Sequence, residues 1–151
     1  MDVTIRSVQT RDLPQLLKVE AQAAPKSPFA AWEFFVLCLR YPENFLVAEG
    51  KGIVGYVVFT PKGHLISLVV ARKHRRQGIG TRLLAEVIRR AAGIPLRLEV
   101  RVGNRGARRF YGALGFREVE TMKSYYPDGE AALLLELAVP HFPVSKAPKE
   151  D

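Results

Sequence analysis

A chain of 151 residues has the length of one domain and can bury a core without help from a metal or a disulfide. Hydrophobic residues make up 48% and charged residues 25%, which is typical of a globular protein and excludes a disordered or membrane-embedded chain. The net charge of +8 favours acidic partners, and the sequence has no run of apolar residues long enough to span a membrane.

The N-terminal third predicts one strand and two helices. Residues 3–8 alternate in polarity, as a strand does. Thr10 is the expected cap of a helix that reaches about Ala23. Ser27 or Pro28 is expected to start a second helix that ends near residue 41. We expect its apolar stripe to lie in the core, with one wall of a substrate groove as the alternative; the stripe is formed by Phe29, Trp32, Phe35, Val36 and Leu39.

The rest of the chain alternates strands and helices. Residues 45–49 and 53–60 predict a hairpin, and 64–70 the next strand. Because one helix, after Gly78, connects that strand to the strand at 96–102, the two should be parallel. A short helix over 104–114 and a closing hairpin of residues 116–126 and 131–138 follow. The proline-containing residues 139–151 are expected to be a flexible tail after a single domain over 1–138.

The stretch from residue 67 to residue 84 predicts a phosphate site. An apolar strand passes through a basic loop and Gly-x-Gly into a helix, whose N-terminal turn attracts anions. Gly78 and Gly80 allow a diphosphate to approach the backbone, and Arg75 and Arg76 add charged donors. Two other phosphate-binding motifs are excluded. The Lys-Ser or Lys-Thr of a Walker A loop does not follow these glycines, and Leu83 stands at the position of the third glycine of the dinucleotide fingerprint.

The motif Arg75-x-x-Gly78-x-Gly80 resembles the acyl-CoA-binding motif of the GNAT acetyltransferases. Further likeness covers almost the whole chain and resembles the RimI-like protein Nα-acetyltransferases. Three groups of residues carry this further likeness. They are residues 64–70 with 74–80, then Leu98-Glu99-Val100-Arg101 with Asn104, Tyr111 and 114–116, and finally residues 125–130. The resemblance implies an α+β fold, with a central and mostly antiparallel sheet of about seven strands. Strands four and five would be parallel and splayed apart, and about four helices would flank the sheet.

The resemblance implies an acetyl-CoA-dependent enzyme that acetylates the α-amino terminus of a protein or peptide. The amine would attack directly in a ternary complex, with Glu99 as general base through a water and Tyr111 as general acid at the sulfur. An α-amine, with a pKa of about 7.7–8.0, needs only modest help from a base. Judged from the residues alone, Glu99 could instead pair with Arg97 or Arg101, and Tyr111 could be an ordinary core residue.

The resemblance also implies which residues contact each substrate. The acceptor would lie against Phe29, Tyr125 and Tyr126, although neighbouring residues of a strand face opposite ways. A backbone N–H group near the end of the strand over residues 64–70 would stabilise the negative charge that develops on the acetyl carbonyl oxygen. Acetyl-CoA would be bound by Leu68, Val69, Val70, Arg75, Arg76, Gln77, Gly78, Ile79, Gly80, Thr81, Asn104 and Tyr111.

Several expectations concern partners and alternatives. Cys38 has no partner for an internal disulfide, which favours a cytoplasmic protein and a buried structural thiol. The histidines have no ligand-like grouping, so no metal is expected. A ribosome or an auxiliary subunit is a candidate partner, whereas a membrane or a nucleic-acid substrate is not expected. Two alternatives remain open: a GNAT enzyme that acetylates a lysine or a small amine, and a non-enzymatic module that binds acyl-CoA or nucleic acid.

Overall fold

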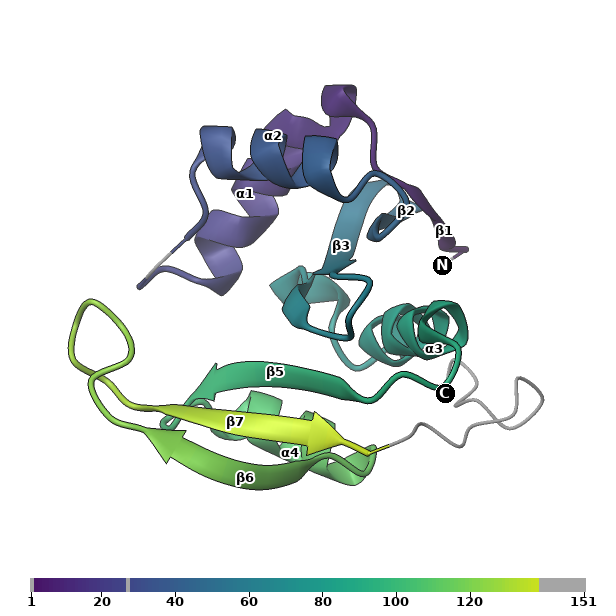
Figure 1. Cartoon of the computed structure of the whole chain (residues 1–151). Helices are drawn as coiled ribbons and strands as arrows, with labels where there is room; N and C mark the ends of the chain where they lie inside the picture. The colour runs from purple at the N-terminus through teal and green to yellow at the C-terminus, as the bar shows by residue number, and fades with distance from the viewer. Residues whose placement is uncertain (1, 27, 139–151) are drawn as a thin grey trace.

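The computed structural model describes residues 2–26 and 28–138, which form an α+β structure with two antiparallel sheets (Figure 1). The first sheet has the order β1-β2-β3-β4, from Thr4–Ser7, Phe45–Gly50, Gly52–Phe59 and Leu65–Val70. The second has the order β5-β7-β6, from Leu96–Arg101, Ala132–Leu137 and Arg117–Met122. The described residues thus contain the seven strands that were expected, divided between two sheets.

Four α-helices occur in the described part of the chain, as predicted: α1 (Leu13–Ala23), α2 (Ala31–Arg40), α3 (Ile79–Ala91) and α4 (Arg105–Ala113). Short 3-10 turns precede α1 and α3, at Thr10–Asp12 and Arg72–His74. Figure 1 shows α1 and α2 together above the first sheet and α3 between the levels of the two sheets. Within residues 2–26 and 28–138, no helix is long and apolar enough to cross a membrane.

The core divides into two clusters because β2 and β3 are apolar on both faces. Leu46 and Val57 face α3, in a cluster that also contains residues of β5 and β7. Phe45 and Tyr56 face the other way, toward α1 and α2. Successive side chains of a strand point to opposite faces, so continuous apolar strands are expected when both faces are covered. The helix α3 therefore joins the two sheets into one packed body.

Strands β4 and β5 are parallel where they meet and then diverge. In the described residues, a single bridge between His64 and Arg97 joins the two sheets. The N–H group of Arg97 donates to the carbonyl oxygen of Gly63 at 2.9 Å beside this bridge. The predicted parallel and splayed pair is confirmed, and its separation opens a space between the C-terminal halves of β4 and β5.

Three predicted boundaries are wrong. Thr10 does not cap the first helix; it lies within a 3-10 turn, where the Asp12 carboxylate accepts from the N–H group of Gln9 at 2.8 Å. The second helix begins at Ala31 rather than at Pro28, and Ser27 lies outside the described residues. A carboxylate three residues into each helical segment sets these starts. Strand β6 ends at Met122, before the two tyrosines that were expected to extend it.

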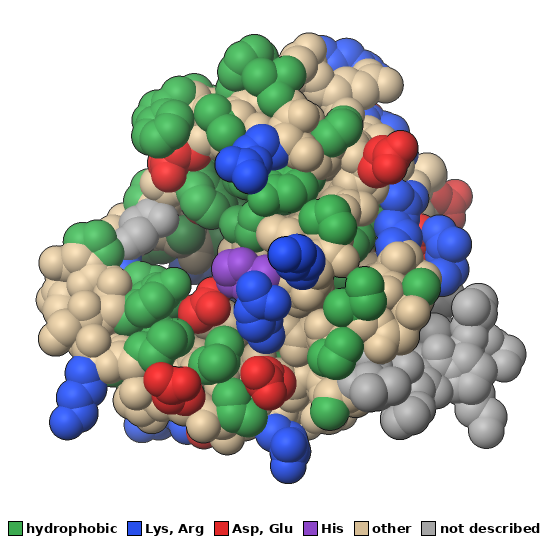
Figure 2. Space-filling model, viewed as in Figure 1, with side chains coloured by type: hydrophobic (Ala, Val, Ile, Leu, Met, Phe, Trp, Pro, Cys, Tyr) green, Lys and Arg blue, Asp and Glu red, His purple; other side chains and the backbone are tan. Residues whose placement is uncertain are grey.

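The predicted burial of the apolar stripe is wrong for its four residues on α2, whereas Phe29, which precedes the helix, is partly buried against the core. Phe34 and Cys38, four residues apart, are the buried residues of this helix. Burial raises the pKa of the Cys38 thiol, as expected for a structural cysteine. The helix is apolar on both faces, so periodicity alone does not choose between them. Figure 2 shows the resulting apolar surface over α2, formed by Trp32, Phe35, Val36 and Leu39.

Candidate active site

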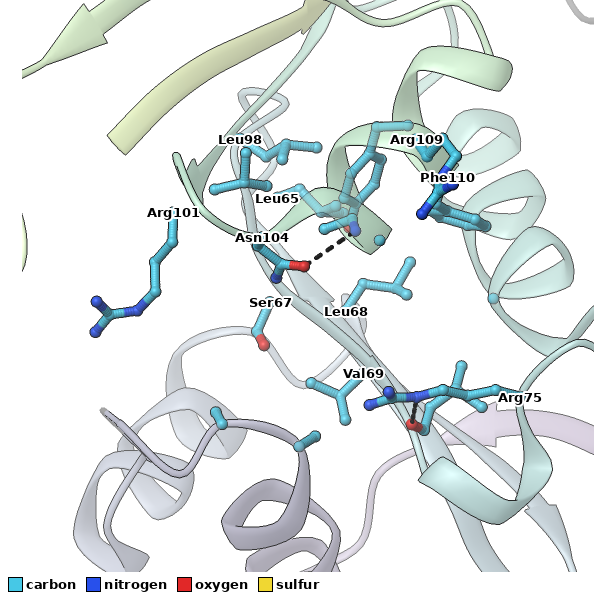
Figure 3. A pocket seen from close by; sticks show the side chains of 18 of the residues that line it. Leu65, Ser67, Leu68, Val69, Arg75, Leu98, Arg101, Asn104, Arg109 and Phe110 are labelled. Carbon is cyan, nitrogen blue, oxygen red and sulfur yellow. Dashed lines mark hydrogen bonds between the residues drawn. The ribbon is translucent and has the colours of Figure 1, made fainter. Parts of the chain in front are cut away.

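A cleft of about 1180 Å³ lies where β4 and β5 diverge (Figures 2 and 3). The connection between α1 and α2, the start of α3, and α4 complete its walls. Gln77 and Tyr125 are the two predicted site residues that do not line it. The cleft brings together the others: Phe29, Leu68, Val69, Val70, Arg75, Arg76, Gly78, Ile79, Gly80, Thr81, Glu99, Asn104, Tyr111 and Tyr126.

Backbone conformation shapes one end of the cleft, at the start of α3. Arg76 and Gly78 have positive φ angles of 62° and 78°. Glycine adopts this conformation without strain, whereas an arginine does so at a cost, and such strain is typical of binding loops. At Gly80 an added Cβ would lie 3.2 Å from the Phe110 ring, so the helix start and α4 can approach closely only without a side chain there.

The same end of the cleft is strongly basic. Residues 68–81 contain several arginines and a lysine and no carboxylate. The Nε atom of Arg75 donates to the carbonyl oxygen of Val70 at 3.0 Å, which holds the guanidinium across the end of β4 (Figure 3). Unpaired N–H groups at the start of α3 add the positive end of the helix dipole. This end is therefore suited to a ligand that carries several phosphates.

Asn104 and Tyr111 lie on the opposite wall, in α4. The Oδ1 atom of Asn104 accepts from the N–H group of Ala107 at 3.1 Å and caps the helix. Tyr111 is 5% exposed and packs edge-to-face against Phe110 and Phe116. Burial raises the pKa of the Tyr111 phenol, so the hydroxyl keeps its proton at neutral pH.

Glu99 lines the cleft and is paired with a histidine. Its Oε1 atom is 2.8 Å from Nε2 of His64, and both side chains remain partly exposed. From the sequence, Arg97 and Arg101 were the candidate partners of Glu99, and His64 was not predicted. The missing signal was the register of β4 and β5, because the bridge at His64 and Arg97 places the start of β4 beside Glu99.

A buried carboxylate, which the sequence analysis also missed, anchors the other end of the cleft. Glu20 is 3% exposed and accepts from the Tyr56 hydroxyl at 2.6 Å and from the N–H group of Phe29 at 3.0 Å. The Tyr56 oxygen is also 2.9 Å from Oγ of Ser67 on β4. Burial raises the pKa of Tyr56, which keeps it a donor. This network ties the α1–α2 connection to the sheet beneath the cleft.

The connection between β6 and β7 forms the remaining wall. Tyr126 lines the cleft, whereas Tyr125 is 48% exposed, so the alternation that the sequence left open favours Tyr126. The two rings contact each other edge-to-face, and partial burial raises the pKa of both phenols. No cluster of three or more His, Cys, Asp or Glu side chains with metal-binding geometry occurs in residues 2–26 and 28–138.

Comparison with known proteins identifies the family and the fold. The profile of the Acetyltransferase (GNAT) family matches residues 5–116. An N-alpha-acetyltransferase of Sulfurisphaera tokodaii is 35% identical, over 87% of this chain and 90% of that protein. The crystal structure of Ard1 from Thermoplasma volcanium has a TM-score of 0.83 at 25% identity and covers 93% of this chain and 100% of that one. The Escherichia coli ribosomal-protein-S18-alanine N-acetyltransferase has a TM-score of 0.77 at 29% identity, over 91% and 94%. The chain belongs to the GNAT family and is an N-acetyltransferase.

Proposed function

We propose that this enzyme transfers the acetyl group of acetyl-CoA to the α-amino group of a protein or peptide. The observation that carries the proposal is Glu99, paired with His64, in a cleft that is also lined by the basic loop before α3 and by two chain connections. Relatives named N-alpha-acetyltransferase, one of them 35% identical, support an amino-terminal acceptor. An α-amine needs only modest help from a base, which agrees with a site in which one carboxylate, Glu99, is paired with a histidine.

The basic end of the cleft fits the phosphates of acetyl-CoA. Arg75 and Arg76 would hold the diphosphate together with the N–H groups that follow Gly78, and glycine at position 80 avoids a tight contact between a Cβ and the Phe110 ring. The splayed edge of β4 leaves room for an extended arm beside Leu68 and Val70. When bound, acetyl-CoA supplies an activated acetyl thioester.

Glu99 is the group that would take the proton of the acceptor amine, directly or through one water. His64 supports it, because the contact of 2.8 Å between Nε2 and the Glu99 carboxylate holds that carboxylate in one orientation. His64 does not line the cleft, so Glu99 faces the acceptor and His64 lies behind it. The partner of Glu99 is therefore His64, and not Arg97 or Arg101 as in the alternative of a structural ion pair.

Tyr111 would donate to the departing sulfur. Its raised pKa keeps the phenol protonated, which makes it a hydrogen-bond donor rather than an anion beside a developing thiolate. A thiol has a pKa of about 8.5 in water, so the phenol is the weaker acid of the two and its hydrogen bond supplies most of the help. The aromatic contacts with Phe110 and Phe116 hold the ring in place for this role.

The test is acetyl transfer to short peptides that differ in their first two residues. Each peptide is paired with a control of the same sequence whose α-amine is blocked and which contains a lysine. We expect transfer to free α-amines alone, detected by mass spectrometry. Transfer to the blocked controls at the same rate would contradict an α-amine acceptor and favour a lysine. Equal transfer to small free amines would favour a small-molecule substrate.

A further inference from the structure

Arg101, at the end of β5, holds the connection between β6 and β7. Its Nη1 atom lies 2.8 Å from Oε1 of Glu130 and 3.0 Å from Oδ2 of Asp128. Its guanidinium carbon lies 4.0 Å from the centroid of the Tyr126 ring. The side chain is only 15% exposed. A planar guanidinium that bonds two carboxylates and covers an aromatic ring fixes an orientation that an exposed ion pair would not.

Glu130 extends this contact to two other segments. Its Oε2 atom accepts from the N–H group of Gly103 at 2.9 Å, and its Oε1 atom lies 3.5 Å from Nζ of Lys26. Lys26 belongs to the α1–α2 connection, which forms the facing wall of the cleft. The hydrogen bond from Arg101 is the main cause that lowers the pKa of Glu130, so the carboxylate stays charged at neutral pH. One carboxylate thus joins the end of β5 to both connections.

The position of Arg101 couples this network to the chemistry. Arg101 is two residues after Glu99 on β5, so both side chains project from the same face of the strand. Arg101, Tyr126 and Glu130 all line the cleft. Figure 3 shows Arg101 and Arg75 at opposite ends of the labelled residues, with Leu68 and Val69 between them. The contacts of Arg101 therefore lie at the acceptor end, away from the phosphate loop.

We propose that Arg101 is a positioning residue that latches residues 123–131 against the acceptor end of the cleft and so sets the affinity for the acceptor chain. It acts through Tyr126, whose ring it covers, and through Glu130, which it holds against Gly103. The inference rests on the proposed function for the identity of the acceptor. The latch itself is a property of these contacts, and it is testable without any acceptor.

The kinetic test compares Arg101→Ala with Arg97→Ala. Arg97 is a matched control, since it lies on the same strand and the same face, and its side chain is exposed. Loss of a charge-assisted contact should raise KM for the acceptor peptide about tenfold in Arg101→Ala. The kcat at saturating peptide and the Kd for acetyl-CoA should stay close to those of the parent, as for a loss of uniform binding. Arg101→Lys, which keeps the charge but not the planar fork, should lie between. An unchanged KM, or equal losses in kcat and in acetyl-CoA affinity, would overturn the latch.

Amide hydrogen exchange tests the latch when the acceptor is unknown. The N–H groups of Gly103, Tyr126 and Gly129 are hydrogen-bonded within or beside the connection. Their exchange should be about tenfold faster in Arg101→Ala and unchanged in Arg97→Ala. Unchanged exchange in Arg101→Ala would overturn the latch. A parent enzyme that acetylates no peptide would instead overturn the proposed function, while faster exchange in the same variant would still support the latch.

Discussion

The two ends of the cleft are built in different ways. The proposed cofactor end comes mainly from one continuous segment, from the second half of β4 to the first turn of α3, with α4 facing it, and the positive φ angles and the helix start set its shape. The proposed acceptor end comes from three segments far apart in the sequence: the α1–α2 connection, the end of β5 and the β6–β7 connection. Side-chain contacts, centred on Glu20, Arg101 and Glu130, hold those segments together. The end that is formed by one stretch of sequence thus owes its shape to backbone conformation. The end that is assembled from distant segments is held together by contacts between side chains.

The difference extends to charge. Residues 68–81 carry no carboxylate, which suits a ligand whose recognised groups are all phosphates. The proposed acceptor end has charges of both signs, with Lys26 and Arg101 beside Glu130. An extended peptide offers an amine, N–H groups and carbonyl oxygens, so a wall of mixed charge matches it better than a uniformly basic one. Single substitutions should therefore separate cofactor binding from acceptor turnover.

The largest expected effect comes from Glu99→Gln, which should leave cofactor binding intact. Loss of a general base typically lowers kcat by roughly 10² to 10⁴. The rate should also rise only at higher pH, because the amine would then have to lose its proton to solvent. Steady-state kinetics between pH 6 and 10 and the Kd for acetyl-CoA check this. Glu120→Gln, on exposed β6, is the control. A parent-like pH profile in Glu99→Gln would remove the carboxylate from the base role.

Tyr111→Phe should have the next largest effect, a fall in kcat of about 10- to 100-fold. The ring and its contacts with Phe110 and Phe116 remain, so only the hydroxyl donor is lost. The Kd for acetyl-CoA and the thermal midpoint should change little. Tyr41→Phe, on a residue that does not line the cleft, serves as the matched control. If turnover in Tyr111→Phe equalled that of the parent, the phenol would be a core residue and no more.

The loop that we propose for the cofactor could be recognised in the sequence because its residues are close together in the chain. Arg75, Gly78 and Gly80 lie within one loop, and Asn104 caps the helix that it begins. The pair of His64 and Glu99 was beyond reach, since the two residues are 35 positions apart on strands that share one bridge. Alternating polarity predicts that strands exist, but it does not give the register between two strands that barely pair.

Helix α2 shows a second limit. Its sequence is apolar on both faces, and the stripe chosen from periodicity proved to be the exposed one, while Phe34 and Cys38 are buried. Burial of a helix face depends on which side meets the sheet, and that is decided by the Phe34 contacts with Phe45 and Tyr56 from strands β2 and β3. Apolar residues at helical spacing indicate that a helix has a face to bury, but they cannot rank two apolar faces.

A smaller effect is expected from Arg75→Ala, which addresses the cofactor end alone. The Kd for CoA should rise about tenfold through loss of a charge-assisted phosphate contact, with KM for the acceptor unchanged. The difference from the parent should shrink as salt is added, and acetyl-pantetheine, which lacks the nucleotide phosphates, should show no difference. Calorimetry measures the Kd for CoA. Arg72→Ala is the control, because Arg72 does not line the cleft. Equal weakening of acetyl-pantetheine would mean that Arg75 supports the loop through its bond to Val70 instead.

The smallest effect is a selective loosening of the acceptor end in acid. The hydrogen bond from Arg101 chiefly lowers the pKa of Glu130 below its usual 4.5, and the N–H group of Glu130 chiefly lowers that of Asp128 below 3.8. A carboxylate with a lowered pKa stabilises the folded form above its unfolded pKa, and this contribution is lost as the pH falls through the folded value. The amide shifts of Gly103 and Tyr126 should therefore move together with a midpoint below 4.5. The amide shifts of Gly78 and Gly80 should stay nearly constant over the same pH range, because residues 68–81 have no carboxylate to titrate.

A midpoint at or above 4.5 would show that Arg101 does not hold Glu130 in solution. A change of the amide shifts at both ends with the same midpoint would show that the two ends of the cleft are one cooperative unit and not two independent ones.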